Sequence, residues 1–179
     1  LKSLQAIYPR FGLNPLVGEI AKLALAKQKG FRDSSAWPFP NLVSAKSAEN
    51  HCKRIVSNAK TTITEVLGLN CLIADQEATP YAKAFWQHTG LGASSRQASI
   101  ALRQEKEPSK DEGAFAISKI QKRLAGIYLC PPELVQIHPS GMAALTTALK
   151  VIYTIRPKKQ VLQLGFPYVD VLKLPQTIF

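Results

Sequence analysis

A short segment in the last third of the chain combines residue types that can hold an anion. The strand-like run Val135–Ile137 meets a turn at Pro139, Ser140 and Gly141, and a small-residue helix follows from Met142. A helix N-terminus presents unpaired amides and the positive end of the helix dipole. Gly141 lets the backbone approach a ligand closely, and Ser140 adds a hydroxyl donor. The pattern indicates a phosphate site, although many α/β folds bind nothing at such a turn.

A second motif follows further along the chain. Gly165–Tyr168 comes directly after another strand-like run at Gln160–Leu164. Tyr168 offers an aromatic face that could lie beside a phosphate-bearing heterocycle. The alternative is a half-buried loop tyrosine with no ligand.

Several motifs together resemble a known family. His138–Ala144 and Gly165–Leu174 are similar to segments of the Cys/Met-metabolism enzymes that use pyridoxal phosphate, and most similar to the fungal-type cystathionine γ-synthase branch. Tyr8–Phe11, Trp86–Gly90 and Ser94–Arg96 resemble that branch too. The resemblance extends over nearly the whole chain, although it is patchy between residues 12 and 80.

The resemblance implies pyridoxal 5'-phosphate as cofactor and assigns roles to five residues. Ser140, Gly141 and Met142 would form the phosphate-binding turn, and Tyr168 would stack on the pyridine ring. Arg96 would reach across a subunit boundary to the neighbour's phosphate, where a guanidinium can donate two hydrogen bonds at once. The alternatives are an ordinary βα turn, a loop tyrosine and an exposed helix arginine. The family has a tyrosine at the position of Ser94, which puts that tyrosine's part in substrate activation in doubt.

The implied activity is that of a cystathionine γ-synthase, a transsulfuration enzyme of methionine biosynthesis that joins cysteine to an activated homoserine ester. Its substrates would be small amino acids, and the protein would be a homo-oligomer, either dimer or tetramer. The alternatives are a γ-lyase or sulfhydrylase of the same family, or a non-catalytic truncated homologue. Lys173 and Asp170 follow Tyr168 too closely to be the family's cofactor-bonding lysine and pyridinium partner. We therefore expect both residues beyond Phe179, and no catalytic residue within this chain, which by itself should be inactive.

Composition bounds the remaining function classes. The chain has 179 residues and a net charge of +11, which favours acidic partners. Its lysines and arginines are scattered along helical faces without zinc-finger spacing or RNA-binding aromatic motifs, so we expect no nucleic-acid partner. No apolar run approaches the length of a membrane span, and we expect no membrane partner. Cys52, Cys71 and Cys130 form no C-x-x-C pair, so we expect reduced, buried thiols in a cytoplasmic protein.

The three histidines have no metal-ligand partner at helical spacing, and we expect no metal site. His138 adjoins the phosphate turn, where a structural hydrogen bond is favoured over a general-base role. We expect His88 to pack at a helix end with Trp86, and His51 to lie on the surface.

Periodicity and end signals predict the secondary structure. Helices are expected at residues 15–29, 47–56, 79–88, 94–105, 114–127 and 141–153. One or two strands are expected within 63–74, broken near Gly68, and single strands at 135–137 and 160–164. The apolar spacing predicts three buried helix faces: Leu16, Ile20 and Leu23; Ala48, Cys52 and Ile55; Phe115, Ile117, Ile120 and Leu124.

The last two strands and the helix between them read as a βαβ unit, which implies a parallel sheet with a right-handed crossover. The predicted fold class is α/β. The resemblance makes it the N-terminal portion of a fold type I pyridoxal-phosphate transferase domain, preceded by a mainly helical segment. We divide the chain into a helical or mixed segment at 1–106, a linker at 107–112, and the start of the cofactor-binding domain at 113–179.

Overall fold

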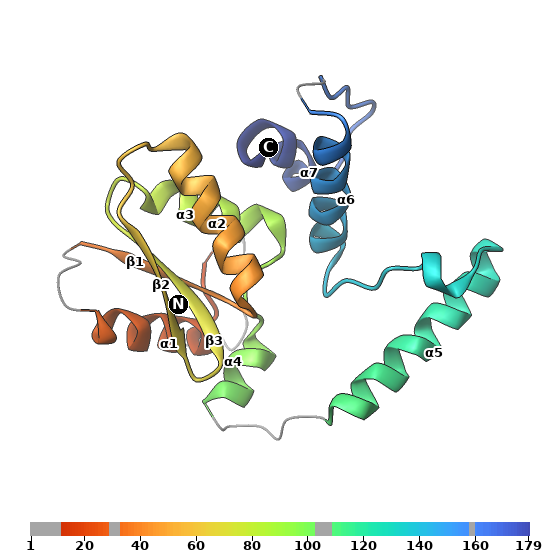
Figure 1. Cartoon of the computed structure of the whole chain (residues 1–179), viewed down its shortest axis with the longest axis horizontal. Coiled ribbons are helices and arrows are strands. Elements are labelled where there is room, and N and C mark those ends of the chain that lie inside the picture. The colour runs from red at the N-terminus through yellow and green to blue at the C-terminus, as the bar shows by residue number, and fades with distance from the viewer. Residues whose placement is uncertain (1–11, 29–32, 103–108, 158–159) are drawn as a thin grey trace.

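The computed structural model describes residues 12–28, 33–102, 109–157 and 160–179, and shows a mixed α/β protein (Figure 1). A small antiparallel sheet forms the centre of the N-terminal part. In chain order the elements are α1 (Pro15–Lys27), β1 (Ser35–Phe39), α2 (Leu42–Ile55), β2 (Thr61–Val66), β3 (Leu69–Ala74), α3 (Thr79–Thr89), α4 (Ser95–Ala101), α5 (Lys110–Tyr128), the 3-10 turn η1 (Pro132–Leu134), α6 (Gly141–Ile155), α7 (Val169–Lys173) and the π-helical turn η2 (Leu174–Ile178).

The sheet has strand order β1-β3-β2, with both pairings antiparallel. Leu67 and Gly68 join β2 to β3 with φ values of 51° and 82°, the left-handed conformation that two-residue hairpins favour. The predicted break near Gly68 is therefore confirmed. Pro38 lies on the edge strand β1, where its missing N–H costs no ladder hydrogen bond. Its carbonyl instead accepts from the Ala93 amide at 2.9 Å and the Trp86 indole at 3.1 Å.

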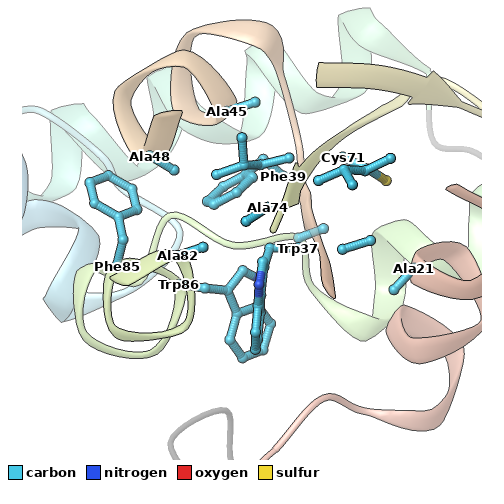
Figure 2. Close-up of a cluster of buried hydrophobic side chains, with 14 of the residues drawn as sticks. Ala21, Trp37, Phe39, Ala45, Ala48, Cys71, Ala74, Ala82, Phe85 and Trp86 are labelled. Atoms are coloured by element: carbon cyan, nitrogen blue, oxygen red, sulfur yellow. The ribbon is translucent and has the colours of Figure 1, made fainter. Parts of the chain in front are cut away.

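Helices cover both faces of the sheet, so β1 and β3 are buried almost throughout. Helix α1 contributes Ile20 and Ala24 to one side of the core, and α2 contributes Ala45 and Ala48 to the other. Figure 2 shows the small side chains of α2 and the aromatic rings of α3 packed around Phe39, which is fully buried. This core holds the end of α3 in place.

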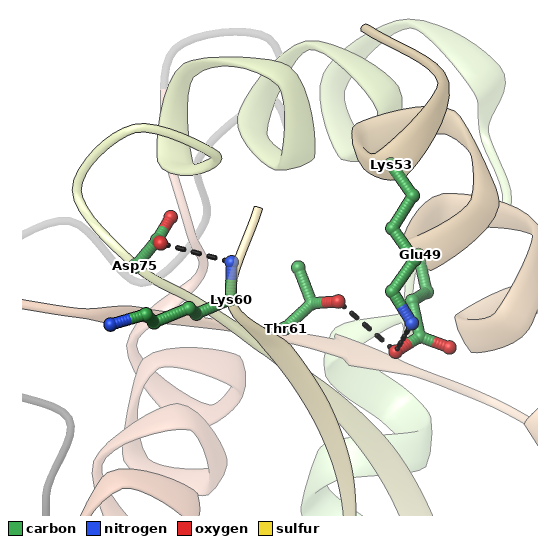
Figure 3. A network of polar contacts seen from close by, with 5 residues as sticks. All are labelled: Glu49, Lys53, Lys60, Thr61 and Asp75. Carbon is green, nitrogen blue, oxygen red and sulfur yellow. Dashed lines mark hydrogen bonds and ion pairs between the residues drawn. The ribbon is translucent and has the colours of Figure 1, made fainter. Parts of the chain in front are cut away.

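A polar network fixes α2 and α3 to the sheet (Figure 3). The Glu49 carboxylate of α2 accepts hydrogen bonds from Thr61 at 3.0 Å and from Lys53 at 2.8 Å. Asp75 accepts from the Lys60 amide at 3.0 Å and from the Ala78 amide at 2.8 Å, immediately before α3. These contacts set where α3 begins, and hence where the residues after it lie.

Local end signals predict the helices well. Asn14 caps α1, with its side chain accepting from Leu16 N at 3.0 Å, and Gly90 ends α3 with φ 67°. Helix α2 begins at Leu42, earlier than predicted, because Asn41 caps it. The motif at Tyr8–Phe11 lies outside the described residues, as do residues 107–108 of the predicted linker, and α5 already begins within that linker.

The predicted helix faces are only partly correct. Ile20, Ala48 and Cys52 are buried as expected, but Leu23 and Ile55 are exposed. The face predicted for α5 is wrong, since three of its four residues are exposed: Phe115, Ile117 and Ile120. Periodicity identifies side chains that share a helix face, but it does not say whether another element covers that face.

The parallel βαβ unit does not form in the described residues. Helix α6 is present, but the segments predicted as its flanking strands, 135–137 and 160–164, have no strand partners. Leu162 and Leu164 are strongly exposed there. A strand exists only when a neighbour completes its hydrogen-bond ladder, and an apolar run cannot identify that neighbour.

Candidate functional site

Helix α6 begins as the phosphate-turn motif predicts. Ser140 is its N-cap, with its hydroxyl accepting from the Ala143 amide at 3.1 Å and its carbonyl accepting from Ala144 N at 3.0 Å. Gly141 and Met142 open the helix, and no acceptor for their amides is found in the part of the chain that the structure describes. The first turn therefore presents two N–H donors and the Ser140 hydroxyl hydrogen.

The end of α3 packs closely on this turn through Gly90. A Cβ at Gly90 would lie 2.6 Å from Ser140 Oγ, 2.8 Å from Ala143 N and 3.0 Å from Met142 Cβ. Only a residue without a side chain fits this approach, and its φ of 67° is also one that glycine adopts readily. The buried Thr146 of α6 fixes the same junction by donating to the carbonyl of Thr89 at 3.0 Å.

A groove of about 570 Å³ opens beside this junction. It runs from the end of α3 and the loop at 90–94, over the start of α4, to the first turn of α6. The side chains important to its chemistry are Trp86, Gln87, Ser94, Arg96, Gln97, Ser140, Met142 and Asp170. We call it the α6 groove. Segments far apart in the sequence therefore meet in a single concave surface.

Arg96 enters the α6 groove from the first turn of α4. Ser94 caps that helix in a capping box, in which its hydroxyl accepts from Gln97 N at 3.2 Å and the Gln97 side chain accepts from Ser94 N at 2.9 Å. The reciprocal bonds hold the first turn of α4, and with it the backbone of Arg96. The arginine itself is exposed, so its guanidinium is available to an anion in the groove.

Asp170 supplies the groove's carboxylate. It is 2% exposed, and its Oδ1 lies 2.9 Å from Nδ1 of His88. His88 accordingly does more than pack at a helix end, because it pairs with an acid 82 residues away. This contact gives the buried Asp170 carboxyl group a hydrogen-bond partner within the groove.

The structure brings together three of the five predicted cofactor residues. Arg96, Ser140 and Met142 all line the α6 groove, and Gly141 adjoins it at the start of α6. Tyr168 is not among the groove-lining residues. It caps α7 and is 46% exposed, although Asp170, two residues later, reaches the groove. The stacking role of Tyr168 therefore remains a prediction.

Sequence reasoning missed the close approach of Gly90 and Gly92. A Cβ on Gly92 would lie 2.4 Å from Nε1 of Trp86, so this glycine lets the loop lie against the indole. The recognised motif Trp86–Gly90 includes Gly90 but not Gly92, and it did not indicate the close packing of either glycine. His51 was also misjudged, because it is 4% exposed and buried rather than on the surface.

The donor set of the α6 groove fits a phosphate ester. Two unpaired main-chain amides, a hydroxyl and a guanidinium are groups that bind such an anion at helix N-termini. The described residues contain no cluster of three or more histidine, cysteine or acidic side chains suited to a metal. Burial raises the pKa values of the Cys52 and Cys71 thiols to about 12, so both are inert, buried side chains. Within the described part, no helix is long and apolar enough to span a bilayer.

The described residues form a mixed α/β protein with a groove beside the first turn of α6. Residues 17–94 match a family model described as the N-terminal domain of fungal trans-sulfuration enzymes. This segment is therefore similar to the N-terminal domain of those enzymes, in agreement with the motifs at Trp86–Gly90 and Ser94. The match runs from α1 to the N-cap of α4, so it includes the α3 side of the groove. No curated protein and no solved structure matches the chain.

Proposed function

We propose that the α6 groove holds the phosphate of pyridoxal 5'-phosphate in an enzyme of the cystathionine γ-synthase type. The observation that carries this proposal is the meeting of Arg96 with Ser140 and Met142 in one groove. The resemblance predicted Ser140 and Met142 as ligands of the chain's own phosphate and Arg96 as a ligand of a neighbour's. Arg96 lies more than 40 residues before the other two in the sequence. The family match supports the broader class, a trans-sulfuration enzyme.

Each residue has a physical task in this proposal. The amides of Gly141 and Met142 donate to phosphate oxygens along the helix axis, and the Ser140 hydroxyl donates while its oxygen caps α6. Arg96 neutralises the dianion from the opposite element. Gly90 keeps the turn in place by packing against it. The cofactor, when bound, would withdraw electrons from the substrate's α-carbon.

Phosphate binding can be measured without aldehyde chemistry at the surface lysines by using pyridoxine 5'-phosphate as ligand. We expect the chain to bind this compound, and to bind unphosphorylated pyridoxine much more weakly. Arg96→Gln should weaken binding about tenfold, since one charge-assisted contact is lost. Arg123→Gln, an exposed change on α5, is the matched control and should have no effect. Equal affinity for the two ligands, or an unchanged affinity in Arg96→Gln, would refute the assignment of the groove.

Oligomerisation is a second part of the proposal. Helix α5 exposes Phe115 at 71%, Ile127 at 65% and Tyr128 at 73%, and such apolar surface is typical of a contact with another chain. Arg96 lines a groove of its own chain, so its contact with a neighbour's phosphate stays a prediction. Sedimentation equilibrium of the native chain and of Phe115→Glu tests the assembly. A monomer at all concentrations would contradict it.

A cytoplasmic location also belongs to the proposal, and fractionation of cells tests it.

A further inference from the structure

A second cavity, the His51 cavity, lies among α2, α3, α6 and η2, and its volume is about 220 Å³. This volume is enough for a small organic molecule rather than a single water. Its lining residues are Ser47, Asn50, His51, Arg54, Phe85, Leu91, Thr146, Lys150, Ile178 and Phe179. None of them is acidic, while two are cationic.

His51 presents a buried polar atom with no hydrogen-bond partner. The residue is 4% exposed and its ring lies against Phe85, with centroids 5.5 Å apart. Its Nε2 is buried and has no partner among the described residues. A buried polar atom without a partner costs free energy, which a ligand or a trapped water can recover.

The contact with Arg54 indicates whether Nε2 of His51 donates or accepts a hydrogen bond. Nη2 of Arg54 lies 3.3 Å from Nδ1 of His51 and also donates to the carbonyl of Ile178. A guanidinium can only donate, so Nδ1 must accept and the neutral ring carries its proton on Nε2. Burial, and secondarily the Arg54 charge, lower the pKa of His51 to about 4, against a weaker opposing effect of the Ile178 carbonyl. Nε2–H is therefore a neutral donor.

Two cations on different helices line the same cavity as His51. Arg54 on α2 contacts backbone carbonyls, and Lys150 on α6 has one long contact, 3.4 Å to Ser47 Oγ. Neither forms an ion pair with an Asp or Glu side chain within the described residues. The nearest acid on α2, Glu49, is already bonded to Lys53 and Thr61. The cavity thus offers an N–H donor and two cations without an acidic side-chain partner to an anion.

The rest of the lining is apolar and limits what the anion carries. Phe85, Leu91 and Ile178 suit a hydrocarbon body. An α-ammonium would find no carboxylate here. We propose that the His51 cavity binds a small monocarboxylate with an apolar body and no ammonium group, its carboxylate received by His51 Nε2–H, Arg54 and Lys150. This site is separate from the phosphate donors of the α6 groove.

Nuclear magnetic resonance of the native chain, labelled at histidine with ¹⁵N, tests the proposal at pH 7. Two-bond ¹H–¹⁵N spectra should show His51 neutral and protonated at Nε2. Titration with 3-methylbutanoate should shift its resonances saturably, with a Kd on the order of 1 mM, as expected for so small a ligand. The neutral 3-methylbutanamide, leucine and inorganic phosphate should bind at least about tenfold more weakly.

Variants make the test specific. Lys150→Gln should weaken 3-methylbutanoate binding about tenfold, and because Lys150 is exposed the fold should survive. His51→Phe should abolish binding, since it removes the donor and fills space. Lys46→Gln, an exposed change also on α2 but outside the cavity, is the matched control and should bind like the native chain. Absence of a saturable shift, equal binding of the amide, or a proton on Nδ1 would each overturn the proposal. Pyridoxine 5'-phosphate binding in the same samples reports on the α6 groove independently.

Discussion

Replacing Gly90 with alanine should destabilise the protein and move the phosphate turn. Gly90 has φ 67°, a conformation that costs an L-residue about 1–2 kcal/mol. The new Cβ would lie 2.6 Å from Ser140 Oγ and 2.8 Å from Ala143 N, so backbone atoms of α6 must shift. Overpacking of this kind costs a further 1–3 kcal/mol or so. The expected loss in the free energy of unfolding is therefore about 2–5 kcal/mol, by the sum of these contributions.

Gly68→Ala provides a matched control. Gly68 also has a left-handed backbone, with φ 82°, but a Cβ added there would meet no atom within 4 Å beyond its chain neighbours. Its alanine variant should show only the backbone cost. Urea denaturation of both variants isolates the steric contribution, with Gly90→Ala less stable than Gly68→Ala by about 1–3 kcal/mol. Equal losses would mean that α3 does not press against the start of α6, and the groove geometry would be wrong.

Three other perturbations test separate features. Gly92→Ala would place a Cβ 2.4 Å from Nε1 of Trp86. We expect a red-shifted indole fluorescence and a loss of about 1–3 kcal/mol in the free energy of unfolding. An unchanged spectrum would contradict the packing of Gly92 against Trp86. Because the pKa of His51 is lowered from 6.5 to about 4, the unfolded chain binds more protons between these values. The free energy of unfolding should therefore fall by roughly 3 kcal/mol as the pH drops through that range. In urea denaturation His51→Phe should lack this loss, and parallel pH profiles of the two proteins would contradict the lowered pKa of His51. Cys52 and Cys71, whose thiol pKa values burial raises to about 12, should resist a thiol reagent at pH 8 until the chain unfolds, and rapid labelling of either would contradict their burial.

Sequence patterns predicted the structural features that depend on residues close together in the sequence. Asn14, Ser94 and Ser140 cap helices as their side-chain chemistry indicates, and Gly90 ends α3. The hairpin at Gly68 likewise depends on the backbone conformation of its own turn residues. The phosphate-turn motif also predicted the start of α6. The family resemblance assigned Arg96 to a neighbouring subunit's phosphate, and that role stays a prediction.

Features that depend on distant partners were not predictable in this way. Asp170 and His51 are polar residues whose burial arises from elements far along the chain, His88 in one case and Ile178 in the other. The exposed Phe115 has the spacing of a core residue, but no described element covers it. The strands expected at 135–137 and 160–164 failed for the same reason, because strand formation needs a partner that periodicity cannot supply.

The loop after α3 links the two proposed binding sites, and this gives a final, discriminating prediction. Leu91 lines both the α6 groove and the His51 cavity, and Thr146 of the cavity bonds to Thr89 beside it. A displacement of this loop must therefore alter both sites. Gly90→Ala should weaken the binding of pyridoxine 5'-phosphate and of 3-methylbutanoate together, whereas Arg96→Gln should weaken only the former. If Gly90→Ala changes one affinity and leaves the other intact, the loop does not connect the sites and each must be held by its own helix.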